Sequence, residues 1–391
     1  MSALRTYLDW NATAPLRPEA RAAMLAAFEL VGNPTSPHAE GRKARAVVED
    51  AREVIARHVN VRPRDVYFTS GATEAANWVL TPNTSRRGNK EPLAALLAGA
   101  TEHACVLRGH RFPEERVEQI AVDADGRIDL PALQSRIAGL TALYGAGSTM
   151  VAVQAANNET GVLQPIGQVA ELLDGWGAIV VCDAVQLAGR GRWAGVMPGA
   201  DIVFLSAHKF GGPKGIGAVA FAGDYVTPEP LLKGGGQERR QRSGTENVAA
   251  IAGLAAALAA AEAEMEAMTA HALALRQRLE NGLRAIRSDT VIFGEGAPRL
   301  ANTSCFAVPG TAAETAVIAL DLEGVAVSSG SACSSGKVGR SHVLEAMGVP
   351  AELASGAIRI STGGTTQKAD IDAFLDVWKR INSRHAHRKV A

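Results

Sequence analysis

The chain has 391 residues and equal numbers of basic and acidic side chains, 40 Lys+Arg and 40 Asp+Glu, so its formal net charge is zero. A balanced charge excludes the global attraction to nucleic acid or anionic lipid that a strongly basic protein has, and we expect neither as a partner. The length favours two or three domains, and 47% hydrophobic with 20% charged residues is typical of a soluble globular protein.

Cysteine use and the N-terminus indicate a reducing compartment. The four cysteines, Cys105, Cys182, Cys305 and Cys333, are scattered and form no C-x-x-C pair. A long chain with few cysteines is not a disulfide scaffold. Residues 1–10 contain no apolar segment of a secretory signal, and every long apolar stretch is interrupted by charges. We therefore expect a cytoplasmic protein that does not enter a membrane.

Short apolar runs alternate with helical patterns through the first two thirds of the chain. This alternation predicts an α/β domain, with a parallel sheet covered by helices on both faces. The runs expected to be buried strands are residues 65–70, 93–99, 149–155, 177–183 and 201–207.

The pattern changes at about Val248. A long helix rich in Ala, Glu and Leu is predicted from there to about Ile286, and shorter strands and helices follow to the end of the chain. We expect these to form a second, smaller α+β domain, with the long helix bridging the two. We assign residues 15–260 to the large domain, and residues 1–14 and 261–391 to the small one.

Two polar features follow predicted strands and suit an anion and a cation. FTSGATEAAN places a Gly turn and a helix start at about Ala72 after a strand, with the hydroxyl of Thr73 nearby. Backbone N–H groups at a helix start favour an anion, although an ordinary helix with Glu74 in its first turn explains this stretch better when it is taken alone. Asp183 follows four apolar residues, where a carboxylate costs several kcal/mol unless it is paired; a helix cap is an equally good explanation.

An imidazole, an amide and an amine follow three other strands. These are His103 in TEHACVL, Asn158 in NNETGV and Lys209 in SAHKFGGPKG. Singly they read as a structural histidine, a polar turn and a surface lysine. Because the carboxyl ends of parallel strands meet at one edge of a sheet, we expect all of these features to lie together. Together they supply what pyridoxal phosphate needs: a phosphate cradle, an acid facing the pyridine nitrogen, a group against the ring and an amine for the aldehyde.

A Ser/Gly-rich segment, SSGSACSSG, carries Cys333 between a short predicted strand and a helix at about Ser341. A cysteine in such a segment is a candidate nucleophile, whereas an accidental surface thiol is the plainer alternative. The other three cysteines lie in or beside strand-like runs, where packing is the better interpretation. A glycine fingerprint at 215–220 precedes a strand instead of following one, and no P-loop sequence occurs, so a nucleotide-binding module is not supported.

With these motifs identified, nearly the whole chain resembles the cysteine desulfurases of the NifS/IscS type, which belong to the class V, fold type I pyridoxal-phosphate enzymes. The stretches that carry the resemblance are YLDWNATAP, GNPTSPHAEGR, FTSGATEAAN, TEHACVL, NNETGVLQPI, CDAVQ, SAHKFGGPKGIGA, GGGQERRQRSGTENV, SSGSACSSG and RISTGG. The resemblance implies a large domain with a mainly parallel seven-stranded sheet and a smaller α+β C-terminal domain.

The resemblance also implies a role for each matching residue. Lys209 would bond to the cofactor's aldehyde, Asp183 would face the pyridine nitrogen, and His103 would stack on the ring and move protons. The phosphate would be held by Ala72, Thr73, Ser206, His208 and, from the neighbouring subunit of a homodimer, Thr245. The ring oxygen side would be contacted by Asn158 and Gln186, and the substrate carboxylate by Arg359 and Asn33. No metal site is implied.

The implied reaction converts L-cysteine to L-alanine, with the sulfur held on Cys333 as a persulfide and passed to an acceptor such as an iron–sulfur scaffold protein. Selenocysteine lyase activity on the same scaffold is the alternative, and Cys333 argues against aminotransfer. A catalytically silent scaffold subunit would lack the lysine or the cysteine, and both are present. After Cys333 the chain has Lys337, Gly339 and Arg340 where the family more often has an acidic residue and a proline, which leaves the acceptor open.

Overall fold

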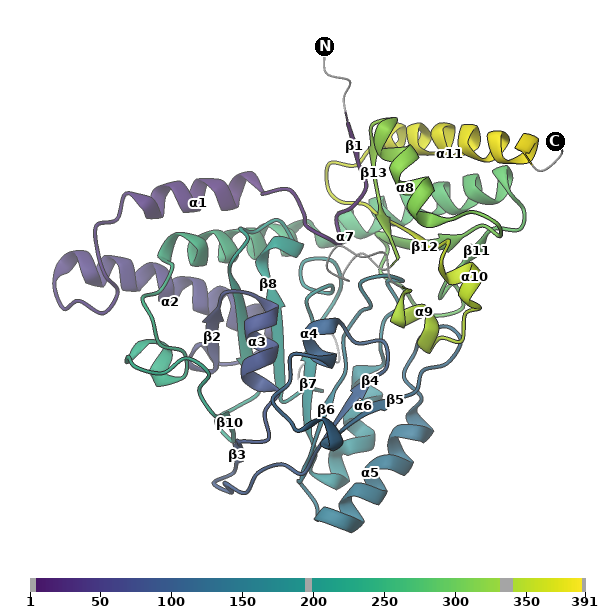
Figure 1. Cartoon of the computed structure of the whole chain (residues 1–391). Coiled ribbons are helices and arrows are strands. Elements are labelled where there is room, and N and C mark those ends of the chain that lie inside the picture. The colour runs from purple at the N-terminus through teal and green to yellow at the C-terminus, as the bar shows by residue number, and fades with distance from the viewer. Residues whose placement is uncertain (1–4, 194–198, 331–339, 389–391) are drawn as a thin grey trace.

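The structure, a computed structural model, describes residues 5–193, 199–330 and 340–388, with side chains up to residue 383. Two unequal parts are joined by the long helix α7 (Val248–Ile286), which runs behind the large sheet and on into the small part (Figure 1). Cys333 lies outside the described residues.

The large part is built on a seven-stranded sheet in the order β2-β9-β8-β7-β6-β4-β5. Its strands are β2 (Val66–Thr69), β4 (Ala95–Gly99), β5 (Val117–Ile120), β6 (Thr149–Ala152), β7 (Ile179–Asp183), β8 (Ile202–Ser206) and β9 (Gly217–Phe221). Only β9 runs antiparallel to its neighbours. The predicted seven-stranded, mainly parallel sheet is confirmed, and each of the five predicted apolar runs contains one of its strands.

Helices cover both faces of this sheet, as the sequence pattern predicts. The covering helices are α2 (Ala39–Val59), α3 (Ala72–Val79), α4 (Ala104–Leu107), α5 (Leu130–Tyr144) and α6 (Ile166–Leu173), together with α7, on which α1 (Pro18–Phe28) packs. Val151 of β6 lies in the core beneath α5 and α6, whereas its neighbour Met150 lies in the core beneath α3 and α4, because successive strand residues point to opposite faces.

Short elements connect or extend the large part. The strands β3 (Thr84–Arg86) and β10 (Val226–Pro228) form a small antiparallel pair. The 3₁₀ turns are η1 (Pro63–Asp65), η2 (Glu114–Arg116), η3 (Asp174–Trp176), η4 (Ala207–Lys209) and η5 (Gln237–Arg240). Lys209 therefore ends a tight turn that follows β8 directly.

The small part has its own core, a four-stranded sheet in the order β11-β12-β15-β14 and a separate two-stranded sheet of β1 and β13. Its strands are β1 (Thr6–Tyr7), β11 (Val291–Ile292), β12 (Thr303–Ala307), β13 (Val325–Ala326), β14 (Ser328–Ser329) and β15 (Ile358–Ser361), and its helices are α8 (Ala313–Leu322), α9 (His342–Ala346), α10 (Ala351–Ala354) and α11 (Lys368–Arg388). Aromatic rings fill the core, with the ring centroids of Phe306 and Trp378 5.4 Å apart. The N-terminal strand β1 pairs with β13, so the chain begins in the small part.

Helix α7 has the predicted bounds and contributes to both cores. Leu254 and Leu258 pack with the large sheet, whereas Leu275 and Leu279 pack in the small part. By length and composition α7 could cross a membrane, but half of its most apolar window is buried inside the protein. Its apolar residues are thus those of a core helix that bridges two parts.

Candidate active site

A cavity of about 640 Å³ lies where the carboxyl ends of the sheet strands meet the small part. Its walls come from the N-terminal segment, the start of α3, the residue before α4, the ends of β7 and β8, and β15. The predicted site residues that line it are Ala72, Thr73, His103, Asn158, Asp183, Gln186, Ser206, His208, Lys209 and Arg359.

Three predicted site residues are not brought to this cavity by the described chain. Asn33 is exposed, and its side-chain oxygen accepts hydrogen bonds from the backbone N–H of Thr35 at 2.9 Å and from the hydroxyl of the same residue at 2.6 Å. Thr245 is also exposed. Cys333 lies outside the described residues. The roles assigned to all three stay predictions.

The amine of Lys209 points back toward the N-terminal segment. Its Nζ donates to the carbonyl oxygens of Asn11 at 2.8 Å and Ala12 at 3.0 Å. The guanidinium of Arg190 donates to the carbonyl oxygen of Lys209 and to the side-chain oxygen of Asn11. The segment YLDWNATAP contributes only to the family resemblance, and no role is predicted from the sequence for Asn11, Ala12 or Arg190.

Asp183 is a buried carboxylate at the end of β7. Its Oδ1 accepts a hydrogen bond from the backbone N–H of Val185 at 2.9 Å, and burial raises the pKa of the carboxyl to about 6. A carboxylate at this depth is stabilised by a cation or a strong donor in the cavity. A protonated pyridine nitrogen is such a group.

His103 precedes α4 and is neutral at pH 7. Its Nδ1 accepts a hydrogen bond from the backbone N–H of Cys105 at 3.1 Å. Burial, with smaller contributions from the nearby charges of Lys209 and His342, lowers the pKa of the imidazole to about 4. Because Nδ1 is an acceptor, the neutral ring carries its proton on Nε2.

The start of α3 forms a cradle for an anion. Gly71, the residue before α3, has a φ of 152° and carries no side chain that could cap the N–H groups at the start of this helix. A Cβ on Gly217 would lie 2.8 Å from the Cα of Gly71, so only glycine lets β9 approach this turn. Ser206 and Thr73 add hydroxyls to the same cavity wall. Backbone N–H groups with hydroxyls suit a phosphate.

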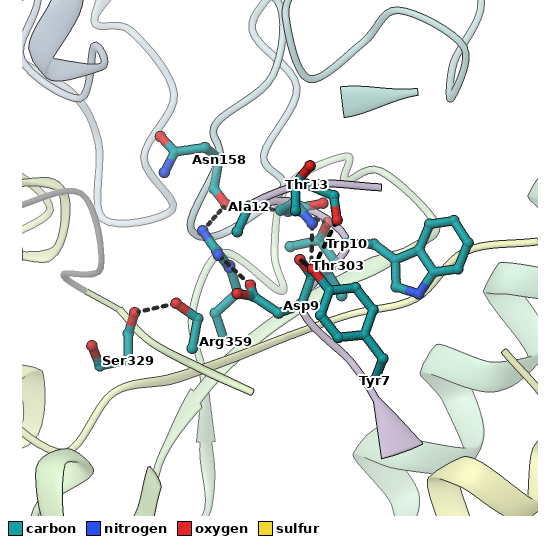
Figure 2. A network of polar contacts seen from close by, with 12 residues as sticks. Tyr7, Asp9, Trp10, Ala12, Thr13, Asn158, Thr303, Ser329 and Arg359 are labelled. Atoms are coloured by element: carbon teal, nitrogen blue, oxygen red, sulfur yellow. Dashed lines mark hydrogen bonds and ion pairs between the residues drawn. The ribbon is translucent and has the colours of Figure 1, made fainter. Parts of the chain in front are cut away.

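Arg359 is almost fully buried, with 2% of its surface exposed, and it lines the cavity. Figure 2 shows its guanidinium between two acceptors: Nη1 donates to the carbonyl oxygen of Asn158 at 3.1 Å, and Nη2 to the Asp9 carboxylate at 2.7 Å. A planar guanidinium with further N–H groups suits a carboxylate.

The residues around the cavity fit pyridoxal phosphate. The cradle at α3 suits its phosphate, buried Asp183 suits its ring nitrogen, and Lys209 supplies an amine at the same edge. When bound, this cofactor withdraws electrons from the Cα of an amino acid attached to it.

A family model described as aminotransferase class-V matches residues 6–374. The chain belongs to the class-V aminotransferase family. Members of this family depend on pyridoxal phosphate, so the predicted cofactor is confirmed.

Individual members of this family are similar to this protein over nearly its whole chain. The chain is 40% identical over 383 residues to a cysteine desulfurase of Cereibacter sphaeroides, covering 95% of this chain and 94% of that protein. It is 37% identical over 377 residues to an IscS-like cysteine desulfurase of Mycobacterium tuberculosis, again covering 95% and 94%. A solved NifS-like protein from Rickettsia africae superposes with a TM-score of 0.85 at 30% identity, covering 97% of this chain and 99% of that one. The resemblance to the NifS/IscS type is therefore confirmed.

Proposed function

We propose that this protein is a pyridoxal-phosphate-dependent cysteine desulfurase that converts L-cysteine to L-alanine and takes the sulfur on Cys333 as a persulfide. The observation that carries the proposal is the meeting of Lys209, Asp183 and His103 in one cavity with Arg359. The names of the relatives in this class-V family agree with it.

The cofactor would be held at its two ends. Ala72, Thr73, Ser206 and His208 would hold the phosphate, and Lys209 would hold the aldehyde. The Asp183 carboxylate would keep the pyridine nitrogen protonated, and that positive charge would in turn lower the pKa of Asp183 from its raised value. Asp183 thus maintains the electron-withdrawing character of the ring.

One side chain in the cavity can move a proton and another can hold one. The Lys209 amine, at the end of the turn that follows β8, would take the Cα proton of the substrate. His103 presents Nε2–H while its Nδ1 accepts the backbone N–H of Cys105, so the neutral ring would donate a hydrogen bond from Nε2 without becoming charged.

The described residues on either side of the Cys333 segment lie next to the site. Ser328 of β14 pairs directly with Arg359 of β15. On the other side, Nε2 of His342 lies 2.8 Å from the carbonyl oxygen of Glu102, the residue before His103. The described residues that flank the Cys333 segment, Ser328 and His342, thus lie beside the cavity, which supports Cys333 as the sulfur acceptor.

We also propose that the protein is cytoplasmic and passes its sulfur to a partner protein, with an iron–sulfur scaffold as the leading class of partner.

We propose in addition that the protein is a homodimer. Phe28, the last residue of α1, is 66% exposed and Val31, just after it, is 87% exposed, and such large apolar side chains suit a subunit contact. Light scattering of the purified holoenzyme tests the dimer: a monomer at micromolar concentration would contradict it.

The reaction is tested by measuring alanine and sulfide formed from L-cysteine by the holoenzyme. We expect equal amounts of both in the presence of a thiol reductant, and loss of both in Lys209→Ala but not in Lys233→Ala, a control at an exposed lysine paired with Glu229. A Cys333→Ala variant that releases sulfide at the parent rate would contradict the role of Cys333. Faster turnover of selenocysteine than of cysteine would favour the lyase alternative.

A further inference from the structure

The Asp9 carboxylate contacts Arg359 from outside the cavity. The two groups form an ion pair of 2.7 Å, and Arg359 lines the cavity whereas Asp9 does not. Asp9 keeps 22% of its side-chain surface exposed, while Arg359 keeps 2%. Figure 2 shows the guanidinium held between the Asp9 carboxylate and the carbonyl oxygen of Asn158.

The pairing leaves part of the guanidinium available. An arginine has five N–H donors. One Nη1 donor goes to the carbonyl oxygen of Asn158 and one Nη2 donor to Asp9. Among the described residues, no hydrogen-bond partner is found for the buried Nε of Arg359. The remaining N–H groups, Nε among them, can serve a carboxylate that enters the cavity.

The backbone fixes Asp9 in this place. Asp9 forms a parallel bridge with Ser361 of β15, two residues beyond Arg359, and residues two apart along a strand share a face. The hydroxyl of Tyr7 shares its one hydrogen between the carbonyl oxygens of Asp9, at 3.0 Å, and Thr13, at 2.8 Å, which closes the turn behind Asp9. The Asp9 carboxylate is thus held against Arg359 by both the sheet and the turn.

We propose that Asp9 is a positioning residue that orients Arg359 for the substrate's carboxylate, so that the N-terminal segment determines how well the site distinguishes amino acids from simple amines. The inference rests on the proposed function only in taking Arg359 as the group that binds this carboxylate. A buried guanidinium that loses its carboxylate partner keeps an uncompensated charge and is free to turn toward other acceptors, so its remaining donors no longer face the cavity.

The test compares two ligands that differ only in the carboxylate, L-alanine and ethylamine. Each is titrated into the holoenzyme, and binding is followed by the change in the cofactor's absorbance, with no turnover required. In Asp9→Ala we expect the dissociation constant of L-alanine to rise at least about tenfold, the usual effect of losing one charged hydrogen bond, and that of ethylamine to change less than about twofold. Asp9→Asn, which keeps an acceptor oxygen, should show a smaller rise than Asp9→Ala.

A control separates positioning from general damage to the fold. Asp372→Asn removes a carboxylate from an exposed ion pair with Arg278 in the same part of the protein and should leave both dissociation constants unchanged. Equal losses for L-alanine and ethylamine in the Asp9 variants, no loss for either, or tighter binding of L-alanine would each overturn the proposal. Turnover of L-cysteine by the unmodified enzyme, measured in parallel, tests the proposed reaction separately.

Discussion

The Glu159 carboxylate, which is fully buried, accepts a hydrogen bond of 2.5 Å from the hydroxyl of Ser341. The same hydroxyl oxygen accepts the backbone N–H of Leu344 and so caps α9. A Cβ on Gly330 would lie 3.6 Å from Oε2 of Glu159, so this one carboxylate adjoins both described ends of the segment that contains Cys333.

This relationship predicts a pH-dependent contribution to stability. Burial raises the pKa of Glu159 to about 7 from 4.5, so the folded protein binds its proton more tightly than the unfolded chain. The resulting stabilisation is fully present below pH 4.5 and is lost as the pH rises through about 7, on the order of 3 kcal/mol in all. In Glu159→Gln, the free energy of unfolding measured in urea should not show this decrease between pH 5 and pH 8. Parallel pH profiles for the two proteins would contradict the prediction.

A buried ion pair fixes the loop that precedes Thr245. Arg52 and Glu238 pair at 2.8 Å with almost no exposed side-chain surface, and Glu238, Arg239 and Arg240 all have positive φ angles, of 46°, 52° and 68°. Non-glycine residues adopt this conformation only when their surroundings enforce it. Glu238→Ala should lower the free energy of unfolding by about 3–5 kcal/mol, because Arg52 stays buried without its main partner.

The matched control for that variant is Glu49→Ala. Glu49 pairs with the same Arg52 but is 53% exposed, so its loss should cost less than about 1 kcal/mol. Equal destabilisation of the two variants in thermal or urea unfolding would show that burial of the pair is unimportant.

Arg190 should be needed for the position of Lys209. Its Nη2 donates to the carbonyl oxygen of Trp10 at 2.8 Å and to that of Lys209, and its Nη1 to Asn11 at 2.9 Å. Arg190→Met removes the donor to these partly buried acceptors, so we expect a loss of about 2–4 kcal/mol in unfolding free energy and weaker retention of the cofactor during dialysis. Arg192→Met, at an exposed arginine paired with Glu266, should change stability by less than about 0.5 kcal/mol. Full cofactor retention in Arg190→Met would refute the role.

His103 should act as a neutral imidazole. Its pKa is lowered to about 4, so the imidazole loses its charge as the pH rises through 4 and is neutral between pH 5 and pH 8. His103→Ala should reduce kcat by about 10²–10³-fold, as expected for loss of a hydrogen-bond donor that acts in the transition state. Because the imidazole is neutral throughout this range, any change of kcat with pH between pH 5 and pH 8 should have the same midpoint in the parent protein and in the variant. A midpoint that disappears with His103 would show that the imidazole titrates in that range.

The features that the sequence predicts well are those that depend on local patterns. Apolar runs locate Asp183 and Lys209 at the ends of strands, and the parallel arrangement then brings them to one edge. The long helix keeps its predicted bounds because its start and its apolar periodicity are both local. The strands β5 and β9 are missed. The four residues of β5, VEQI, are half polar and lie at the edge of the sheet, and β9 overlaps the glycine fingerprint at 215–220 that is expected to precede a strand.

Contacts between distant segments could not be predicted in this way. Asp9 and Arg359 are separated by 350 positions, and no local pattern singles out Arg190. Their roles follow from the N-terminal segment crossing between the two parts, which no local pattern indicates. The roles of Asn33 and Thr245 stay predictions, because the described chain brings neither residue to the cavity.

In the proposed reaction Cys333 takes the sulfur of L-cysteine. The most direct test of this step is mass spectrometry of the Cys333 peptide after the holoenzyme has been incubated with L-cysteine without reductant. We predict one added sulfur on that peptide, removable by a thiol, together with one L-alanine per sulfur, and no added sulfur in Lys209→Ala. Alanine formed while the Cys333 peptide stays unmodified, or sulfur found on Cys105, Cys182 or Cys305 instead, would contradict the account.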